Sequence, residues 1–309
     1  MMRTSTHVLR DSYRLLRPLL RRWEARQVQE AVVDALGALG ARRSAVESNS
    51  VTVAGIQFPN RVGLASGIDR DGIAARAWAH LGFGFAELGP VTAAPHTAGG
   101  TQARGYHNAG AEALAMRLRG YGIERGNRAA GIPFGVSITR SQAVTWPHAV
   151  DDLLRTLQMA APVADYVALT LADPGAHRPT PLPDNGDLEG VLNALVREAE
   201  ELDDLPLFVS VPSEVDATRR DELLRIISGS GAAGVIAGTP DERHAERAVR
   251  FVDDVARSVE LPIIAVGGIL TPRDAVRMFD AGAQLIQLSA GLAVEGPALV
   301  RGIHEWGAR

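Results

Sequence analysis

The feature that most constrains the fold of this chain is a series of short apolar runs that alternate with helical patterns. Each run is four to six residues long and nearly continuous in apolar character. This is typical of parallel strands buried on both faces. Eight of them with helices between predict an α/β fold of the (β/α)8 type, a TIM barrel. The runs are Val62–Ser66, Phe85–Leu88, Phe134–Ile138, Tyr166–Leu171, Leu207–Val211, Gly234–Ala237, Ile263–Val266 and Leu285–Leu288.

The length of the chain leaves room for one segment besides the barrel. It has 309 residues, whereas such a barrel needs about 250. Residues 1–45 show two helical patterns, broken near Pro18 and ended by glycines, and we expect an N-terminal helical extension there. Residues 46–309 would form the barrel, with a hairpin over Val51–Phe58 closing its floor. The segment from Thr92 to Ile132 is too long for an ordinary loop, and we expect it to cover the substrate.

Composition excludes several classes of function. The net charge of −4 gives no sign of a nucleic-acid partner. The chain has no cysteine and no lysine, which excludes disulfides, thiolate metal sites and a lysine Schiff base. His96, His107 and His148 lack the spacing of metal ligands, so we expect no metal site.

The N-terminal residues leave the location of the protein partly open. The chain has no apolar run long enough to span a bilayer and no secretory signal, and we expect a cytoplasmic protein. Between Val8 and Arg22, leucines interleave with arginines at helical spacing. Such a helix suits peripheral contact with a membrane surface. The alternative is a helix that docks on its own barrel or on the second subunit of a homodimer.

The segment Pro262–Leu292 carries the clearest candidate binding site. In barrels of this type the chemistry lies at the C-terminal ends of the strands. The seventh run ends in Gly267-Gly268 and the eighth in Ser289-Ala290-Gly291. Small residues there leave backbone N–H groups accessible, and we predict a phosphate cradle formed by Gly267, Gly268, Ala290 and Gly291. Tight packing between neighbouring loops is the alternative explanation for the same residues.

Four stretches carry a resemblance to a known family. Asn60–Gly72 is close to the pattern NPxGLAAGxDKxG, and Gly82–Thr92 matches GFGxxExGTVT. Val266–Ile269 and Ala281–Ala283 match the last βα unit of the same family. The chain resembles dihydroorotate dehydrogenases of the quinone-linked class over nearly its whole length. The resemblance implies FMN on the barrel, its phosphate at the last two strands, and a small-molecule substrate stacked on the flavin.

The resemblance also implies which residues contact the cofactor. Besides the phosphate cradle, the family's contacts fall on Ser66 and Gly67 at the end of the first run, Ser137 in the third and Thr170 in the fourth. The lysine that contacts both flavin and substrate in the family is Arg70 here. A guanidinium keeps the charge but is larger and planar. Arg70 is therefore a candidate catalytic cation.

Candidate substrate and catalytic residues come from three other motifs. The family's substrate loop NRMGFNN aligns with Met116–Gly122 and places Arg117 near the substrate. The TNT motif after the sixth strand aligns with Gly238-Thr239-Pro240, which suggests Thr239 as a substrate contact. The catalytic Ser of the family is replaced by Asp173. Asp173 is a candidate base, or else a loop residue satisfied by backbone N–H groups.

Several family contacts are absent from this sequence. Ser137 and Thr170 stand where the family has Asn, and Ser210 stands where a lysine faces the flavin. A serine supplies no positive charge to stabilise a reduced flavin. Each lost buried amide contact costs about 1–3 kcal/mol. We therefore expect an FMN oxidoreductase repurposed to a substrate other than dihydroorotate.

Two other functions stay open at this stage. One is a flavin-free barrel that performs acid–base chemistry such as cyclisation, dehydration or isomerisation. Asp173 would then be the base, and Arg70 or Arg117 would bind the developing negative charge. The other is a non-catalytic partner or scaffold protein. The altered polar residues favour these two, whereas the intact patterns around Gly67 and Gly267 favour the flavoenzyme.

Overall fold

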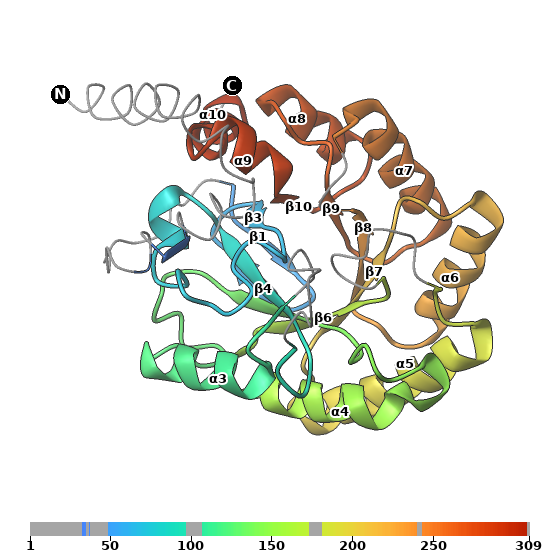
Figure 1. Cartoon of the computed structure of the whole chain (residues 1–309). Helices are drawn as coiled ribbons and strands as arrows, with labels where there is room; N and C mark the ends of the chain where they lie inside the picture. The colour runs from blue at the N-terminus through green and yellow to red at the C-terminus, as the bar shows by residue number, and fades with distance from the viewer. Residues whose placement is uncertain are drawn as a thin grey trace, which may run out of the picture.

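Eight parallel strands form a closed barrel in a computed structural model that describes residues 33, 34, 37, 49–96, 107–172, 181–239 and 243–307 (Figure 1). The strands pair in the order β10-β3-β4-β5-β6-β7-β8-β9, which confirms the predicted (β/α)8 barrel. Their bounds are β3 Val62–Leu64, β4 Phe85–Val91, β5 Phe134–Ile138, β6 Tyr166–Thr170, β7 Leu207–Val211, β8 Gly234–Gly238, β9 Ile263–Val266 and β10 Leu285–Leu288.

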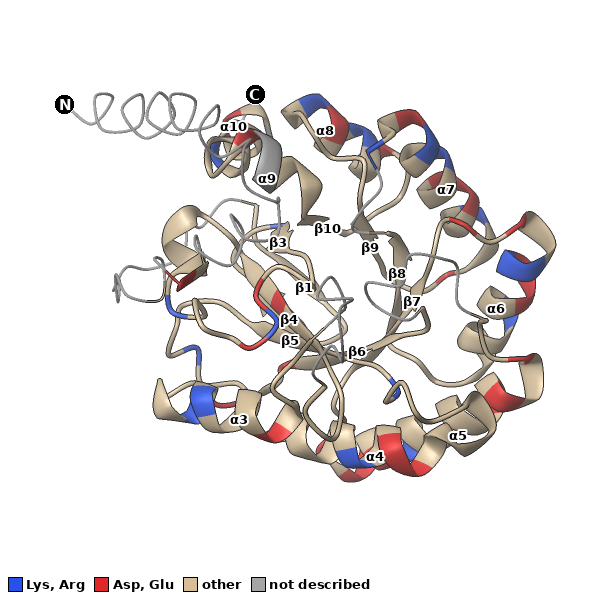
Figure 2. Ribbon diagram, in the orientation of Figure 1, with Lys and Arg blue, Asp and Glu red and all other residues tan. Residues whose placement is uncertain are grey.

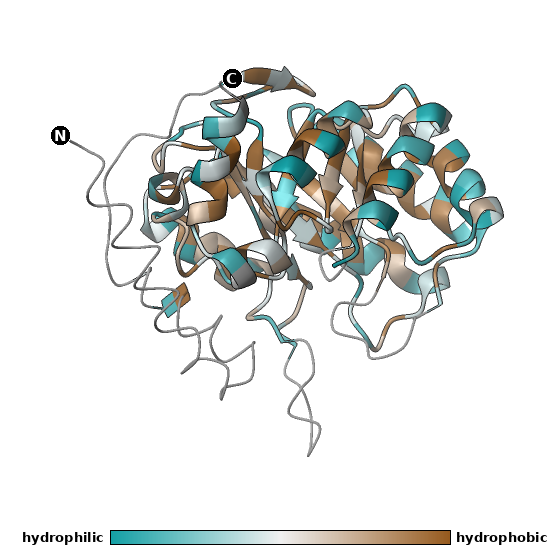
Figure 3. Ribbon diagram, turned by 90° about the horizontal axis from the view of Figure 1, so that it is seen from above, coloured by the Kyte–Doolittle hydropathy of each residue, from teal (hydrophilic) through white to brown (hydrophobic). Residues whose placement is uncertain are grey.

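Helices surround the barrel and carry its charged residues on their outer faces (Figure 2). Hydrophobic residues, brown in Figure 3, concentrate on the strands and on the helix faces turned toward them. Side-chain caps start three helices, at Asp184, Asp216 and Thr271. The helices are α3 Ala111–Gly120, α4 Ala149–Ala160, α5 Asn185–Glu201, α6 Ala217–Gly229, α7 Ala245–Ser258, α8 Pro272–Asp280, α9 Ala290–Glu295 and α10 Ala298–Gly307, with short 3-10 turns η1 Trp78–Leu81, η2 Trp146–His148 and η3 Ala161–Val163.

Aromatic rings that lie over glycines fill the barrel at the N-terminal ends of its strands, which we call the floor. Strands β1 (Val51–Val53) and β2 (Ile56–Phe58) form the predicted hairpin, and its Phe58 ring packs edge-on against Phe85 at 5.2 Å. Across each of three strand pairs, a glycine stands directly opposite an aromatic residue. A Cβ atom on that glycine would lie only 2.1–2.3 Å from the ring. The pairs are Gly63 with Phe85, Gly135 with Tyr166, and Gly234 with Phe208.

This layer of rings closes one end of the barrel. Phe85, Tyr166 and Phe208 are fully buried, and Tyr166 packs edge-on against Phe208 at 5.3 Å. Their glycine partners have no side chain, so the rings can turn into the interior without a clash. Any ligand-binding chamber must therefore lie above this layer, at the opposite end of the barrel.

The segment between the second and third barrel strands contains α3 at residues 111–120, one of the helices that surround the barrel. Residues 97–106 of this segment lie outside the described residues, so its role as a substrate cover stays a prediction. Of the predicted N-terminal extension, Val33, Asp34 and Gly37 are described and are helical. Val33 is buried within the main core, and a Cβ on Gly37 would lie 2.8 Å from the carbonyl oxygen of Ile73. These described residues thus contact the barrel.

The remaining residues of the N-terminal extension, which carry the predicted membrane or subunit contact, lie outside the described residues. Among the helices that the structure describes, none is both long and apolar enough to cross a bilayer.

Candidate functional site

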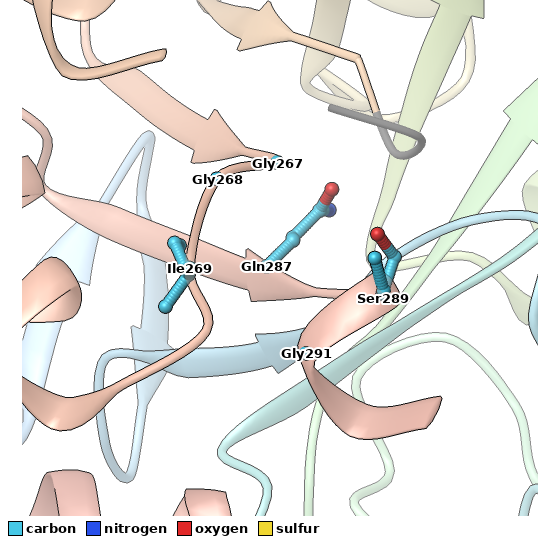
Figure 4. Close-up of a pocket in the computed structure, with 7 residues that line it drawn as sticks. Gly267, Gly268, Ile269, Gln287, Ser289 and Gly291 are labelled. Atoms are coloured by element: carbon cyan, nitrogen blue, oxygen red, sulfur yellow. The ribbon is translucent and has the colours of Figure 1, made fainter. Parts of the chain in front are cut away.

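A small, shallow hollow lies between the C-terminal ends of β9 and β10 (Figure 4). Gly267 and Gly268 are consecutive residues in left-handed conformations, with φ of 87° and 68°. Glycine adopts such values without the strain that a side chain would cause. The four residues of the predicted phosphate cradle all line this hollow. The complete lining is Gly267, Gly268, Ile269, Gln287, Ser289, Ala290 and Gly291.

Two of the cradle glycines also have a packing role. A Cβ on Gly268 would lie 2.5 Å from the Cβ of Ala248 on α7. A Cβ on Gly291 would lie 2.1 Å from the carbonyl oxygen of Ile269. Tight packing therefore accounts for the glycine at both positions. It brings the two loops close enough for their backbones to face one hollow.

The chain after β3 offers a second stretch of accessible backbone. The Gly67 N–H donates to the carbonyl of Gly89 at 2.7 Å, and the Ala65 N–H donates to that of Leu288 at 3.0 Å. These bonds tie the end of β3 to strands on both sides of it. Gly67 has a φ of 88°, and no atom lies within 4 Å of the position a Cβ would take. A flat ligand can therefore approach the backbone closely here, next to Ser66.

Ser137 and Thr170 are brought together by the pairing of β5 with β6. Their hydroxyl oxygens are 2.7 Å apart, with either as the donor, and Ser137 is fully buried. The Thr139 hydroxyl donates to the carbonyl of Thr170 at 3.3 Å. Ser210 is the register partner of Thr170 on the next strand. This side of the barrel mouth thus presents small neutral hydroxyls.

A buried carboxylate that the sequence reasoning missed lies inside the barrel. Glu87 on β4 is 2 % exposed, and its Oε2 accepts from Gln287 Nε2 at 2.7 Å and from the Tyr166 hydroxyl at 3.1 Å. Burial raises the pKa of Glu87 to about 7, against the opposing effect of hydrogen bonds from Gln287, Tyr166 and Ser66. The signal in the sequence was a glutamate within the otherwise apolar run Phe85–Leu88.

A second buried carboxylate shapes the loop after β3. The carboxylate of Asp69 accepts from the N–H of Ile73 at 2.8 Å, the N–H of Ala74 at 3.0 Å and Trp78 Nε1 at 2.9 Å. Burial raises the pKa of Asp69 to about 6, and the three hydrogen bonds oppose that rise. These contacts fix the turn that carries Arg70, which is half-buried.

The remaining candidate residues have different positions. Arg117 on α3 donates a hydrogen bond to the carbonyl of Asp71, so it ties α3 to the loop after β3. Thr239 directly follows β8, where Gly238 has a φ of 117°. Asp173, the candidate base, lies outside the described residues. In the described part of the chain, no group of three or more His, Asp or Glu side chains is placed to hold a metal ion.

The comparison with protein families agrees with this barrel and its mouth. The family model of dihydroorotate dehydrogenase matches residues 48–239 and 229–306. The chain belongs to the dihydroorotate dehydrogenase family. It is 36% identical over 297 residues to the dihydroorotate dehydrogenase (quinone) of Chloroflexus aurantiacus, covering 82% of this chain and 80% of the relative. It is 36% identical over 288 residues to that of Salinispora arenicola, covering 81% and 82%.

A solved structure shows the same fold. The chain superposes on a crystal structure of DHODH from Eimeria tenella in complex with ferulenol with a TM-score of 0.79. The two are 20% identical, and the match covers 94% of this chain and 93% of the other.

Membership of the dihydroorotate dehydrogenase family makes FMN the expected cofactor and a small molecule the expected substrate. The residues present fit FMN at its phosphate end, where Gly267 and Gly268 expose backbone beside Ala290 and Gly291. The open backbone at Gly67 fits a flat ring. The fit is poorer near Ser210, which supplies no cation.

Proposed function

We propose that this chain is an FMN-dependent oxidoreductase of the dihydroorotate dehydrogenase family that acts on a small molecule other than dihydroorotate. The observation that carries the proposal is the hydrogen-bonded pair of hydroxyls on Ser137 and Thr170. An amide side chain offers two N–H donors and a carbonyl acceptor, whereas a hydroxyl offers one donor and an acceptor oxygen. The bond between the two hydroxyls uses one of their two donors, so this side of the mouth offers fewer donors than a pair of amides would and is poorly matched to a ring that requires several amide contacts.

The cost to a dihydroorotate-like substrate can be put in numbers. The sequence has Ser137 and Thr170 where the resemblance implies asparagines, and an unsatisfied buried polar group costs about 1–3 kcal/mol. Two such losses amount to about 2–6 kcal/mol, and each 1.4 kcal/mol is about tenfold in affinity. This supports a loss of binding between roughly thirtyfold and 10⁴-fold.

Each candidate residue has a task in this proposal. Bound FMN would supply two-electron redox chemistry, with its phosphate held by the cradle and its ring against Ser66 and Gly67. Arg70, on the loop that Asp69 fixes, would orient an anionic group of the substrate. Arg117 and Thr239 would contact the substrate, and Asp173 would remove a proton from it.

The first experiment measures the flavin. We expect purified protein to absorb in the flavin bands and to release FMN on denaturation. We expect dihydroorotate not to bleach that absorbance under anaerobic conditions. Rapid bleaching by dihydroorotate would show an ordinary dihydroorotate dehydrogenase and refute the altered specificity. Colourless protein that takes up no added FMN would refute the flavin itself.

One observation favours a second candidate, the flavin-free acid–base barrel. Packing accounts for Gly268 and Gly291 without any phosphate. In that case Asp173 would be the base, and Asp173→Asn would abolish product formation while the protein stays folded. Unchanged turnover in Asp173→Asn would exclude this candidate.

A further inference from the structure

Glu87 and Gln287 connect the barrel interior to the hollow at its mouth. Gln287 on β10 lines the hollow, and its side chain rises from the strand toward the level of Gly267 (Figure 4). The same side chain donates from Nε2 to Glu87 Oε2 at 2.7 Å. Both residues are almost completely buried. One hydrogen bond therefore separates the carboxyl group of Glu87 from a side chain that faces the candidate ligand.

The surroundings of Glu87 leave both of its charge states accessible. Ser66 at the end of β3 and Gln287 are neutral, and the titratable group that faces Glu87 is Tyr166 from β6. Burial raises the pKa of Tyr166 well above its usual range, so Tyr166 stays a neutral donor. Within the described residues Glu87 makes no ion pair. No cation there offsets the cost of burying its charge.

The charge state of Glu87 affects which end of the Gln287 amide it can bind. An ionised carboxylate only accepts hydrogen bonds, so it requires the NH2 end of the amide, as seen here. The carbonyl oxygen of Gln287 is then directed away from Glu87. A protonated carboxyl still accepts but also has an O–H to donate, and the carbonyl end of Gln287 can take that hydrogen bond if the amide turns. The two amide ends would exchange places through rotation about the last side-chain bond.

We propose that Glu87 is a positioning residue whose protonation reverses the Gln287 amide and so changes what the hollow offers a ligand. With Glu87 ionised, Gln287 presents a carbonyl acceptor to the hollow. With Glu87 protonated, it presents N–H donors. An anionic group such as a phosphate prefers donors and also prefers the loss of a nearby negative charge. An anion therefore binds with uptake of up to one proton from solvent by Glu87, the amount depending on how far Glu87 is ionised before binding.

The amide reversal is tested on protein without ligand. The ¹⁵N–¹H signals of the Gln287 side chain, assigned by their loss in Gln287→Met, are followed from pH 5 to pH 9. We expect one step near pH 7 in the wild type and none in Glu87→Gln. Gln158 is the internal control, because its amide donates to Glu198 in an exposed pair at 2.8 Å where water can serve either orientation. A flat Gln287 profile in the wild type would overturn the proposal.

Proton uptake is tested with FMN, and this part rests on the proposed function. Calorimetric titrations at pH 7 in two buffers of different ionisation enthalpy give the number of protons taken up on binding. The phosphate of FMN can itself exchange protons on binding in both proteins, so we expect the wild type to take up a fraction of a proton more than Glu87→Gln. Binding with the same proton count in both proteins would overturn the coupling and leave the proposed function intact. Absence of FMN binding would refute the proposed function, and the amide titration would then decide the reversal alone.

Discussion

Replacing Glu87 by Gln removes a buried charge while keeping an oxygen that accepts from Gln287 and Tyr166. The pKa of Glu87 is raised from 4.5 to about 7 by burial. Between these values the native state holds more protons than the unfolded chain, so the free energy of unfolding falls as pH rises. A difference of roughly 2.5 pKa units corresponds to about 3 kcal/mol at about 1.4 kcal/mol per unit. The side chain is fully buried, so solvent screening does not reduce this figure.

The assay is urea unfolding of wild type and Glu87→Gln at several pH values from 4.5 to 8. At pH 4.5 the two proteins should differ little, because both carry a neutral side chain in the native state. At pH 8 the variant should be the more stable by about 3 kcal/mol. Asp69 and other groups titrate equally in both proteins and cancel in the difference.

The comparison requires that the urea dependence of the unfolding free energy is the same in both proteins at each pH. A difference that stays constant from pH 4.5 to pH 8 would refute the reasoning. A variant that becomes less stable relative to wild type as pH rises would refute it as well.

Three other changes test the packing and the site. Gly135→Ala places a methyl group against the neighbouring tyrosine ring and should lower the free energy of unfolding in urea by about 1–3 kcal/mol. The control is Gly190→Ala on α5, where a Cβ meets open space. This change should leave the free energy of unfolding equal or raise it by up to about 1 kcal/mol. Equal effects at the two glycines would contradict the ring layer. Ser137→Ala combined with Thr170→Val in a double-mutant cycle should give a coupling energy of about 1 kcal/mol, and additive losses would show that the pair contributes nothing. In FMN-loaded protein, Ser210→Lys should raise the two-electron midpoint potential by about 20 mV per kcal/mol of added stabilisation; an unchanged potential would place Ser210 away from the flavin.

The strands of the barrel were predictable because a buried parallel strand is a simple pattern. β5 and β7 match their predicted bounds, and β4 extends three residues beyond its predicted end at Leu88. The longer β4 was not predicted because Gly89-Pro90 is typical of a turn. The position of the hollow could be predicted from two observations. Chemistry in such barrels lies at the C-terminal ends of the strands, and β9 and β10 are each followed by small residues.

The Glu87 cluster could not be predicted, because it depends on which side chains face each other across the barrel. Glu87 and Gln287 are 200 positions apart in the chain. The interior side chains alternate between strands in a register that the sequence does not display. The glycine–aromatic pairs could not be predicted either. The sequence around Gly135 does not show that the Tyr166 ring occupies the space where a side chain at position 135 would lie. The sequence showed Ser137 and Thr170 only as two separate replacements of asparagine, and it did not show that their hydroxyls are hydrogen-bonded to each other.

The ring layer at the floor has an evolutionary consequence. Phe85, Tyr166 and Phe208 interlock with glycines of neighbouring strands, so a change at the floor needs a matching change on the adjacent strand. Residues at the mouth such as Arg70 and Ser210 stand on loops or strand ends and can change singly. A lineage built on this barrel can therefore alter its chemistry step by step while its floor stays the same.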